Sequence, residues 1–170
     1  MKAIYDLKRH PQISIEPFDP AHLDAIVALS LRAWAPVFVS IEQAMDPEVY
    51  RAQHPDWRVD QKKAVEGVCA DETMHVWVAL DDDTVAGFVA VHLHAEWKMG
   101  EIHMIAVDPD SQQRGIGVAL SEFALARMTE AGMTTAMVQT GGDPGHAPAR
   151  RTYEKTGFRV FPVAQYFKKL

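Results

Sequence analysis

The spacing of apolar and polar positions changes part-way along the chain, which predicts helices first and mainly strands later. Between residues 23 and 34, apolar side chains recur every three or four positions, as on one face of a helix. Asp19-Pro20 precedes them, a pair typical of a helix cap followed by the first helical position. Prolines 36, 47 and 55 then break the pattern. We therefore expect a strand over residues 12–16, a first helix that weakens at Pro36, and shorter helices over residues 42–53 and 57–69.

In the second half the spacing shortens to two, as in strands, and two helices interrupt the strands. Strands are expected over residues 74–80, 85–94, 101–107 and 134–140, with a closing hairpin over residues 158–161 and 163–168. The acids at 81–83 read most simply as a solvated turn. Helices are expected over about 116–131 and 147–156, each followed by a glycine, Gly132 or Gly157. This order is typical of an α/β fold, or of an α+β fold with a mixed sheet.

The composition limits the classes of protein to which the chain can belong. The 170 residues, of which 48% are hydrophobic and 24% charged, suit one soluble globular domain over residues 1–170, with residues 1–11 as a flexible arm. The net charge of −6 argues against nucleic acid as the main partner. No signal peptide or long apolar run is visible, so we expect a cytoplasmic protein without a membrane partner. The apolar neighbours of Cys69, the single cysteine, indicate a buried and unreactive thiol.

A loop with two glycines, between the strand at 101–107 and the next helix, is the first candidate for chemistry. Backbone N–H groups at a helix start have no acceptor within the helix and favour anions. Gly115 and Gly117 leave room for a phosphate to touch the backbone, and Arg114 adds a positive charge. The loop lacks the Gly-Lys-Ser/Thr ending of a Walker loop and the three glycines of a dinucleotide fingerprint. The alternative is a tight turn whose glycines serve packing alone.

Two motifs at a fixed separation resemble those of one known family. Residues 112–117 (Gln-Gln-Arg-Gly-Ile-Gly) fit the pattern Gln/Arg-x-x-Gly-x-Gly/Ala and follow a strand that ends Ile105-Ala106-Val107-Asp108-Pro109. Residues 149–158 form a late helix with a tyrosine and a Gly-Phe ending. Both strongly resemble motifs of the GNAT superfamily of N-acetyltransferases, and the order of elements agrees from about residue 12 to residue 170. The resemblance implies an α/β fold with a splayed, mostly antiparallel mixed sheet flanked by helices, and acetyl-CoA as co-substrate.

The resemblance also implies which residues meet the coenzyme. The backbone N–H groups from Gln113 to Val118 would hold the pyrophosphate. The backbone of residues 105–107 would pair with the pantetheine arm and polarise the thioester carbonyl. An asparagine that touches the coenzyme in many relatives is replaced here by His146. The expected coenzyme contacts are Ile105, Ala106, Val107, Gln112, Gln113, Arg114, Gly115, Ile116, Gly117, Val118 and His146.

Candidate proton donors and acceptors lie on the late helix and on the strand at 101–107. By the same resemblance, Tyr153 protonates the departing thiolate, with a packing role as the alternative. Glu101 aligns with the catalytic glutamate of the histone-acetyltransferase branch, and strand alternation puts His103 on the same face. A hairpin turn just before Glu101 would place His94 opposite Glu101 and His92 opposite His103. This group is a base relay, a solvated face on which water takes the proton, or a zinc site.

The expected function is acetyl-CoA-dependent acetyl transfer to a primary amine of a small molecule or peptide. The alternatives are a non-catalytic acyl-CoA-binding or sensor module, and a transferase for a longer acyl chain. Tyr153 and Glu101 favour turnover, whereas the loop at 112–117 is common to all three readings. Acids in the early helices could attract an amine or only solvate the surface, and these are Glu42, Asp46 and Glu48. The oligomeric state is open between monomer and homodimer.

Overall fold

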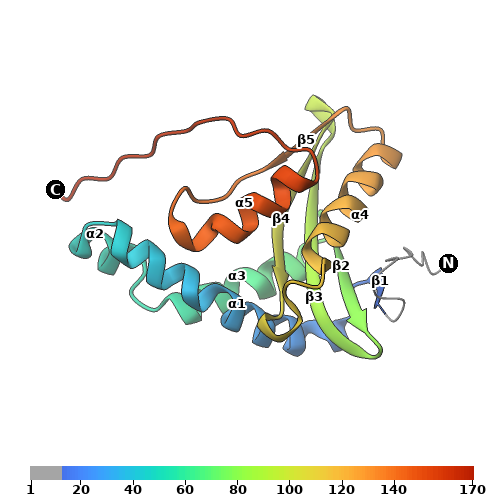
Figure 1. The fold of residues 1–170 in the computed structure, drawn as a ribbon, viewed down its shortest axis with the longest axis horizontal. Helices are drawn as coiled ribbons and strands as arrows, with labels where there is room; N and C mark the ends of the chain where they lie inside the picture. Colours follow the sequence, from blue (N-terminus) through green and yellow to red (C-terminus); the bar gives the residue numbers. More distant parts are fainter. Residues whose placement is uncertain (1–12) are drawn as a thin grey trace.

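The structure is a computed structural model, and it describes residues 13–170 (Figure 1). Its strands are β1 (Ile13–Pro17), β2 (Met74–Asp81), β3 (Thr84–His94), β4 (Met99–Val107) and β5 (Thr135–Val138). Its α-helices are α1 (Leu23–Ala44), α2 (Pro47–Gln53), α3 (Trp57–Ala70), α4 (Ile116–Glu130) and α5 (Ala147–Lys155). Four 3-10 turns join them: η1 (Pro20–His22), η2 (Ala95–Trp97), η3 (Pro109–Ser111) and η4 (Pro144–His146). Residue 12 of the predicted first strand and the arm at 1–11 lie outside the described residues.

The sheet is mixed, with its strands in the order β1-β2-β3-β4-β5. Neighbouring strands run antiparallel from β1 to β4, and β5 runs parallel to β4. β5 pairs only with residues 99–102 of β4. Among the described residues, residues 103–107 of β4 therefore have a strand on one side only, since β3 is their sole neighbour. The splayed, mostly antiparallel α/β sheet that the family resemblance implied is thus confirmed.

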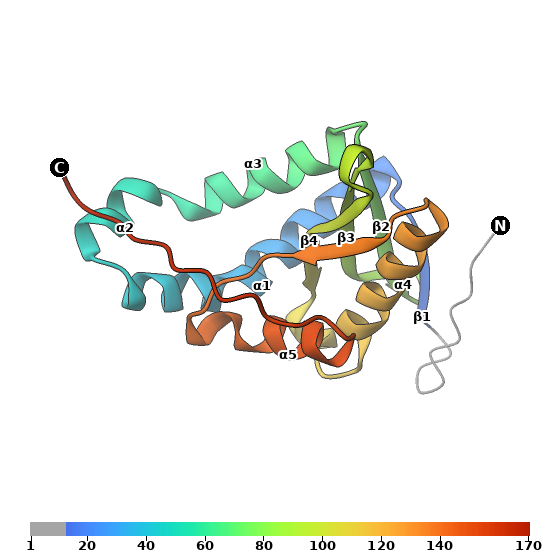
Figure 2. The same cartoon turned by 90° about the horizontal axis from the view of Figure 1, so that it is seen from above.

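Helices cover both faces of the sheet, and each face has its own apolar core. α1 and α3 lie on one side of the strands, and α4 and α5 lie on the other (Figure 2). The first core joins α1 and α3 to the sheet and includes Ile26, Leu29, Val65, Val78 and Phe88. The second joins α4 to the opposite face and includes Ile116, Leu120, Phe123 and Met128. Full burial of each such side chain stabilises the fold by roughly 1.5–3 kcal/mol, so the start of α4 is anchored against the sheet.

α1 continues through Pro36, where the sequence predicted that it would weaken. A proline inside a helix removes one backbone hydrogen bond, which contacts made further along can offset. Here the second half of α1 packs on α3, and the rings of Phe38 and Trp57 stack with centroids 4.5 Å apart. α2 is correspondingly shorter than expected, and it begins after Asp46, whose carboxylate accepts hydrogen bonds from the N–H groups of Glu48 and Val49.

One helical segment, Pro20–Ala44, is long and apolar enough to cross a membrane by length and composition. The sequence pattern did not predict this segment as a possible membrane span. In the described structure Ile26, Val27 and Leu29 on this segment are buried in the core beside the sheet. The core helix of a soluble domain has the same features, so the segment is weak evidence for a membrane span.

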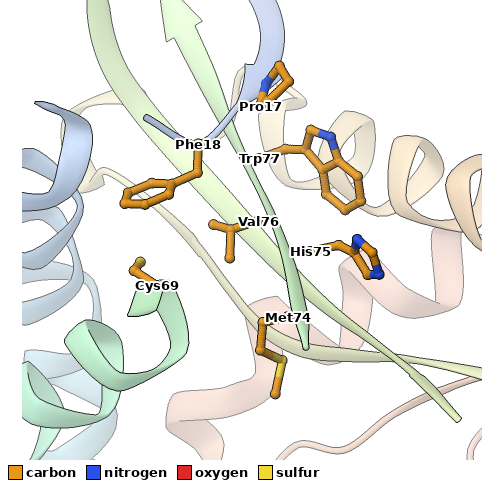
Figure 3. A pocket seen from close by; sticks show the side chains of 7 residues that line it. All are labelled: Pro17, Phe18, Cys69, Met74, His75, Val76 and Trp77. Carbon is orange, nitrogen blue, oxygen red and sulfur yellow. The ribbon is translucent and has the colours of Figure 1, made fainter. Parts of the chain in front are cut away.

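Cys69 lies at the end of α3, beside a hollow that Phe18, Met74 and Val76 also line (Figure 3). Burial raises the pKa of its thiol to about 11. The thiolate is the reactive form of cysteine, so the thiol stays protonated at neutral pH, although Cys69 is partly buried and not fully buried as the sequence predicted.

The predicted closing hairpin is wrong. Gly157, with φ +92°, ends α5, and residues 158–170 contain no strand. Within the described chain, no backbone–backbone hydrogen bond involves residues 159–170, which we call the C-terminal arm. Alternating apolar residues predict a strand, but a strand forms only where a neighbour takes up its backbone N–H and C=O groups.

Candidate active site

The loop between β4 and α4 presents a series of backbone N–H groups. Gln113 and Gly115 have positive φ angles of 62° and 82°, which turn the chain sharply into the helix. The first helical hydrogen bond runs from the N–H of Ala119 to the carbonyl of Gly115, at 3.0 Å. Among the described residues, none of the N–H groups from Gln113 to Val118 has a hydrogen-bond acceptor. Such a cluster at a helix start suits an anion such as the pyrophosphate of coenzyme A.

Ion pairs hold this loop in place. Arg114 at its centre pairs with Asp81, the last residue of β2, at 2.6 Å. At its start, Arg32 of α1 pairs with Asp108 at 2.9 Å and with Asp110 at 2.5 Å. The expectation that the acids at 81–83 are simply solvated is therefore wrong for Asp81. The positive charge of Arg114 is largely engaged by Asp81, so its clearest role is to position the loop.

The second half of β4 offers an open strand edge beside the loop. Ile105, Ala106 and Val107 pair with β3 on one side, and β5 has already separated from them on the other. The backbone groups on that free side can pair with an extended chain such as the pantetheine arm. A bulge lies just before them, because Ala90 pairs with Met104 while Val91 pairs with Ile102. His103 is the extra residue of this bulge, and bulges commonly re-aim side chains next to active sites.

The loop, β4 and α5 meet at Gly117. A Cβ atom added there would lie 3.6 Å from Thr152 of α5 and 3.7 Å from Val107 of β4. The structure therefore brings the predicted coenzyme residues of the loop and of β4 together with the helix that carries Tyr153.

Tyr153 is 9% exposed and lies on α5 next to Phe158, with ring centroids 6.0 Å apart. Burial raises the pKa of its hydroxyl to about 12, so the hydroxyl is protonated at neutral pH. Among the described residues no side-chain hydrogen bond engages it. The hydroxyl therefore carries a hydrogen that no group of the described chain accepts.

His92, His94, Glu101 and His103 come together, although the predicted register is wrong. His92 lies opposite Glu101, and His94 lies opposite Met99, because the turn through η2 is tighter than expected and β4 begins at Met99. The side chains still meet across the strands. Nε2 of His94 is 2.8 Å from Glu101 Oε2 and 3.3 Å from Nδ1 of His92, and Nδ1 of His103 is 3.5 Å from Glu101 Oε1.

The charge state of this histidine–glutamate cluster follows from its contacts. Burial works to raise the pKa of Glu101, but the hydrogen bond with His94 and the charge of His103 outweigh it, so the pKa is lowered. Glu101 is thus a carboxylate at neutral pH and stabilises a positive charge on the imidazole that it holds. Two imidazole nitrogens and a carboxylate oxygen within 4.8 Å are also ligand types for zinc. The hydrogen bond between His94 and Glu101 forms without an ion, and it is the contact that a base relay needs.

His146, which replaces the asparagine of many relatives, is held by partners that sequence reasoning missed. Its Nδ1 hydrogen-bonds Asp143, and the same carboxylate accepts from the Ser40 hydroxyl of α1 at 2.6 Å. Burial works to raise the pKa of Asp143, but these two hydrogen bonds outweigh it and lower the pKa. Arg150 of α5 also donates to the Asp143 carbonyl, at 2.9 Å. The Asp-Pro-Gly turn at 143–145 was the only local signal for this arrangement.

Comparison with known proteins identifies the family. The sequence profile of the acetyltransferase (GNAT) family matches residues 38–158. The chain belongs to this family. The GNAT chain is 28% identical over 164 residues to the mycothiol acetyltransferase of Rhodococcus jostii, an alignment that covers 85% of this chain and 51% of that protein. With the mycothiol acetyltransferase of Streptomyces coelicolor it shares 34% over 82 residues, 48% of this chain and 26% of that protein. The chain spans about half the length, or less, of these curated relatives.

Solved structures show the same GNAT fold. An aminoglycoside 6'-N-acetyltransferase from Acinetobacter haemolyticus superposes with a TM-score of 0.66 at 15% identity, covering 92% of this chain and 98% of that chain. AAC(6')-Iy, in complex with a bisubstrate analogue of coenzyme A and acetylneamine, superposes with a TM-score of 0.64 at 16% identity. That match covers 93% of this chain and 98% of the other.

Proposed function

We propose that this GNAT domain transfers an acetyl group from acetyl-CoA to a primary amine of a small molecule. Three features lie together at Gly117: the N–H groups of residues 113–118, the open edge of β4 and the helix that carries Tyr153. This arrangement is the observation that carries the proposal. A packing turn alone would not need a row of N–H groups without acceptors beside an unpaired strand edge. Membership of the GNAT family supports the same reading.

In this proposal, backbone groups of the loop and of β4 make most of the contacts with the coenzyme. The N–H groups of residues 113–118 hold the pyrophosphate, with Gln112 and Arg114 positioning the loop. The backbone of Ile105, Ala106 and Val107 lines the pantetheine arm along the open edge of β4, at whose end the Val107 carbonyl accepts a hydrogen bond from Gln112 at 3.3 Å. A backbone N–H aimed at the thioester oxygen stabilises the negative charge that develops there, which is worth about 2.7–4 kcal/mol in comparable acyl-transfer sites. His146, fixed by Asp143, adds one polar contact.

Acetyl transfer then requires one proton acceptor and one donor. The amine nitrogen attacks the thioester carbon, the C–N bond forms, and the C–S bond breaks. The amine proton passes to an imidazole held by Glu101, either His94 at 2.8 Å or His103 at 3.5 Å. The hydroxyl of Tyr153 donates a hydrogen bond to the departing sulfur, which leaves as the thiolate. Lowering of the Glu101 pKa supports a carboxylate that steadies the imidazolium over one that takes the proton itself.

We propose a small-molecule acceptor because the relatives bear the names of mycothiol and aminoglycoside acetyltransferases. Two of the acids considered as amine attractors are engaged elsewhere, since Asp46 caps α2 and Glu48 pairs with Lys169. Glu42 of α1, the third of these acids, is exposed and makes no ion pair or cap among the described residues, so it stays the candidate to attract an amine. A cytoplasmic location, with neither nucleic acid nor membrane as a partner, also belongs to the proposal.

The test is release of free thiol from acetyl-CoA across a panel of aminoglycosides, amino sugars, polyamines and short peptides. We expect turnover with at least one small-molecule amine and an N-acetylated product by mass spectrometry. Binding of acetyl-CoA by calorimetry without thiol release on any amine would overturn the proposal in favour of the sensor module. Turnover on peptides alone would overturn the choice of acceptor.

A further inference from the structure

The histidine–glutamate cluster contains one contact that the proposed proton relay does not use. In the relay, Glu101 Oε2 accepts the single hydrogen that Nε2 of His94 can carry, at 2.8 Å. Nδ1 of His92 lies 3.3 Å from the same Nε2. A carboxylate supplies no hydrogen of its own, so in either tautomer of His94 one hydrogen serves only one of these two contacts. Three lone-pair atoms therefore converge with one hydrogen too few to join them all.

A zinc ion between these atoms would satisfy all three at once. His92 Nδ1, His94 Nε2 and a carboxylate oxygen of Glu101 lie within 4.8 Å of one another. Nitrogen and oxygen ligands lie about 2.0–2.2 Å from tetrahedral zinc, and hence about 3.3–3.5 Å from each other. The 3.3 Å between the two imidazole nitrogens already matches that spacing. The 2.8 Å contact of His94 with Glu101 needs to open by only about half an ångström.

Two neighbouring strands hold the three side chains in this arrangement. His92 and His94 are two residues apart on β3 and therefore point to the same face of the sheet. His92 is paired directly with Glu101 of β4. Sites built on strands are positioned more precisely than sites built on loops. The side chains of His94 and Glu101 are 20% and 21% exposed, so an ion would be shielded but would still have a path from solvent.

Two further side chains around the cluster favour a cation. Nδ1 of His103 is 3.5 Å from Glu101 Oε1, the oxygen that His94 does not engage. Carboxylates that bind metals are commonly held by such a neighbour. Asp71 adds negative charge at the end of α3. Its pKa is lowered by hydrogen bonds from Thr73 and, to a smaller extent, by the charges of His92 and His103, so this carboxylate acts on the same imidazoles.

We propose that His92, His94 and Glu101 form a reversible inhibitory site for zinc, with water as the fourth ligand. Two imidazoles and one carboxylate select zinc over magnesium and calcium, which prefer oxygen ligands. Bound zinc occupies the lone pair of His94 and the charge of Glu101, on which acceptance of the amine proton depends. Zinc and the proton relay therefore exclude each other. The inhibition rests on the proposed acetyl transfer, whereas the binding of zinc does not.

Competition with a chromophoric zinc chelator tests binding on the intact chain, without acetyl-CoA or amine. We expect one zinc per chain, which excess magnesium does not displace. His92→Ala removes a ligand to which the proposed proton transfer assigns no step. Residues that only support a ligand are worth about 10–100-fold in metal affinity, so this variant should bind zinc at least about 100-fold more weakly.

His75→Ala is the matched control for this measurement. His75 is exposed on β2 and stacks on Trp77, with ring centroids 6.1 Å apart, so its loss should leave the zinc affinity unchanged. Zinc should also raise the Tm of the wild-type protein and of this control, because a ligand that binds only the folded state stabilises it. No binding at micromolar zinc, or equal affinities for the two variants, would overturn the site.

Inhibition is measured separately, with an amine that the protein acetylates. The N-acetylated product is followed by mass spectrometry, because zinc binds the free thiol of coenzyme A. One equivalent of zinc should slow wild-type protein and His75→Ala, EDTA should restore the rate, and His92→Ala should need at least about 100-fold more zinc. Bound zinc without effect on the rate, or loss of activity in EDTA, would overturn the inhibitory role. If no amine is acetylated, that role fails together with the proposed transfer, whereas the binding measurement still decides the zinc site.

Discussion

Tyr153 and Glu101, on which the proposed proton transfers depend, lie in opposite environments. Tyr153 is buried away from charges, and its pKa rises to about 12. Glu101 is also partly buried, but its histidine neighbours outweigh that burial, and its pKa falls. At neutral pH one group is a neutral donor and the other a negative partner for an imidazolium, which is the pairing that acetyl transfer to an amine requires.

Tyr153→Phe should slow the chemical step and leave coenzyme binding intact. The change removes one hydroxyl and keeps the ring that packs on Phe158. Because the tyrosine pKa of about 12 exceeds that of a thiol near 8.5, complete transfer of the proton is uphill by roughly 5 kcal/mol, and the hydroxyl acts mainly as a hydrogen-bond donor to sulfur. We expect kcat to fall about 10²–10³-fold, or roughly 3–4 kcal/mol, with little change in KM for acetyl-CoA. Single-turnover rates are the decisive measurement, and a full rate in the variant would leave Tyr153 with a packing role.

Glu101→Gln should weaken the dependence of the rate on pH. If an imidazole beside Glu101 accepts the amine proton, kcat/KM rises through an apparent pKa of about 6–8 and flattens above it. Loss of the carboxylate removes the stabilisation of the imidazolium, so this limb should move to lower pH and the rate near neutrality should depend less on pH. Glu96→Gln, an exposed residue of η2, is the control and should keep the wild-type profile. Profiles that follow only the free amine in all three proteins would assign the proton to water, and loss of activity on chelation would give zinc a catalytic role.

Among the elements, the turn from β4 into α4 has the most specific geometry. Its glycines and positive φ angles expose N–H groups, and its ion pairs with α1 and with the end of β2 hold it in place. The local sequence determines the first of these features, whereas the ion pairs join residues more than 30 positions apart.

Gly117→Val should weaken acetyl-CoA binding, and Gly117→Ala should be tolerated. A Cβ atom at this position has ordinary contacts of 3.6–3.8 Å with Thr152 and Val107, so alanine fits. The two methyl groups of valine would fill the space between α4, α5 and β4 next to the N–H groups. We expect the affinity by calorimetry to fall about tenfold or more, at least about 1.4 kcal/mol, with an unchanged circular dichroism spectrum. An unchanged affinity would remove the loop from the proposed site.

Asp143→Asn tests the link between α1 and the turn before α5. The folded-state pKa of Asp143 is lowered, so its contribution to stability is present above its unfolded value, near 3.9, and is lost as the pH falls through the folded value. Hydrogen bonds to a charged group contribute about 1.5–3 kcal/mol, so the variant should lose roughly that much at pH 7. Urea unfolding should show this difference at neutral pH and a smaller one in acid. A difference that does not depend on pH would contradict the assignment.

At the scale of the whole molecule, burial of a thiol and a phenol in their protonated forms should lower the stability of the fold at alkaline pH. Burial raises the folded-state pKa of Cys69 to about 11 and of Tyr153 to about 12. A raised pKa gives stability that is full below the unfolded value, about 8.5 for a thiol, and is lost as the pH rises towards the folded value. We expect Tm to fall between about pH 8.5 and 11, and to fall less steeply in Cys69→Ala. Equal slopes in both proteins would exclude the thiol as a cause.

The amino-acid sequence alone was enough for the order of the elements up to α5, the position of the loop at 112–117 and the glycines that end α4 and α5. These depend on spacing, caps and turns between residues close along the chain, which act in the same way in any fold. The family resemblance supplied the splayed sheet, which strand pairing confirmed.

Other features were decided by contacts between distant residues. α1 continues through Pro36 because Phe38 stacks on Trp57, and the turn through η2 sets which histidine faces Glu101. Ser40 of α1 holds Asp143, the partner of His146, from across the fold, and the arm after Gly157 forms no strand because no strand edge of its own chain receives it. Register, ion pairs and strand pairing depend on the free energy of contacts that exist only after the chain has folded, so local periodicity does not specify them.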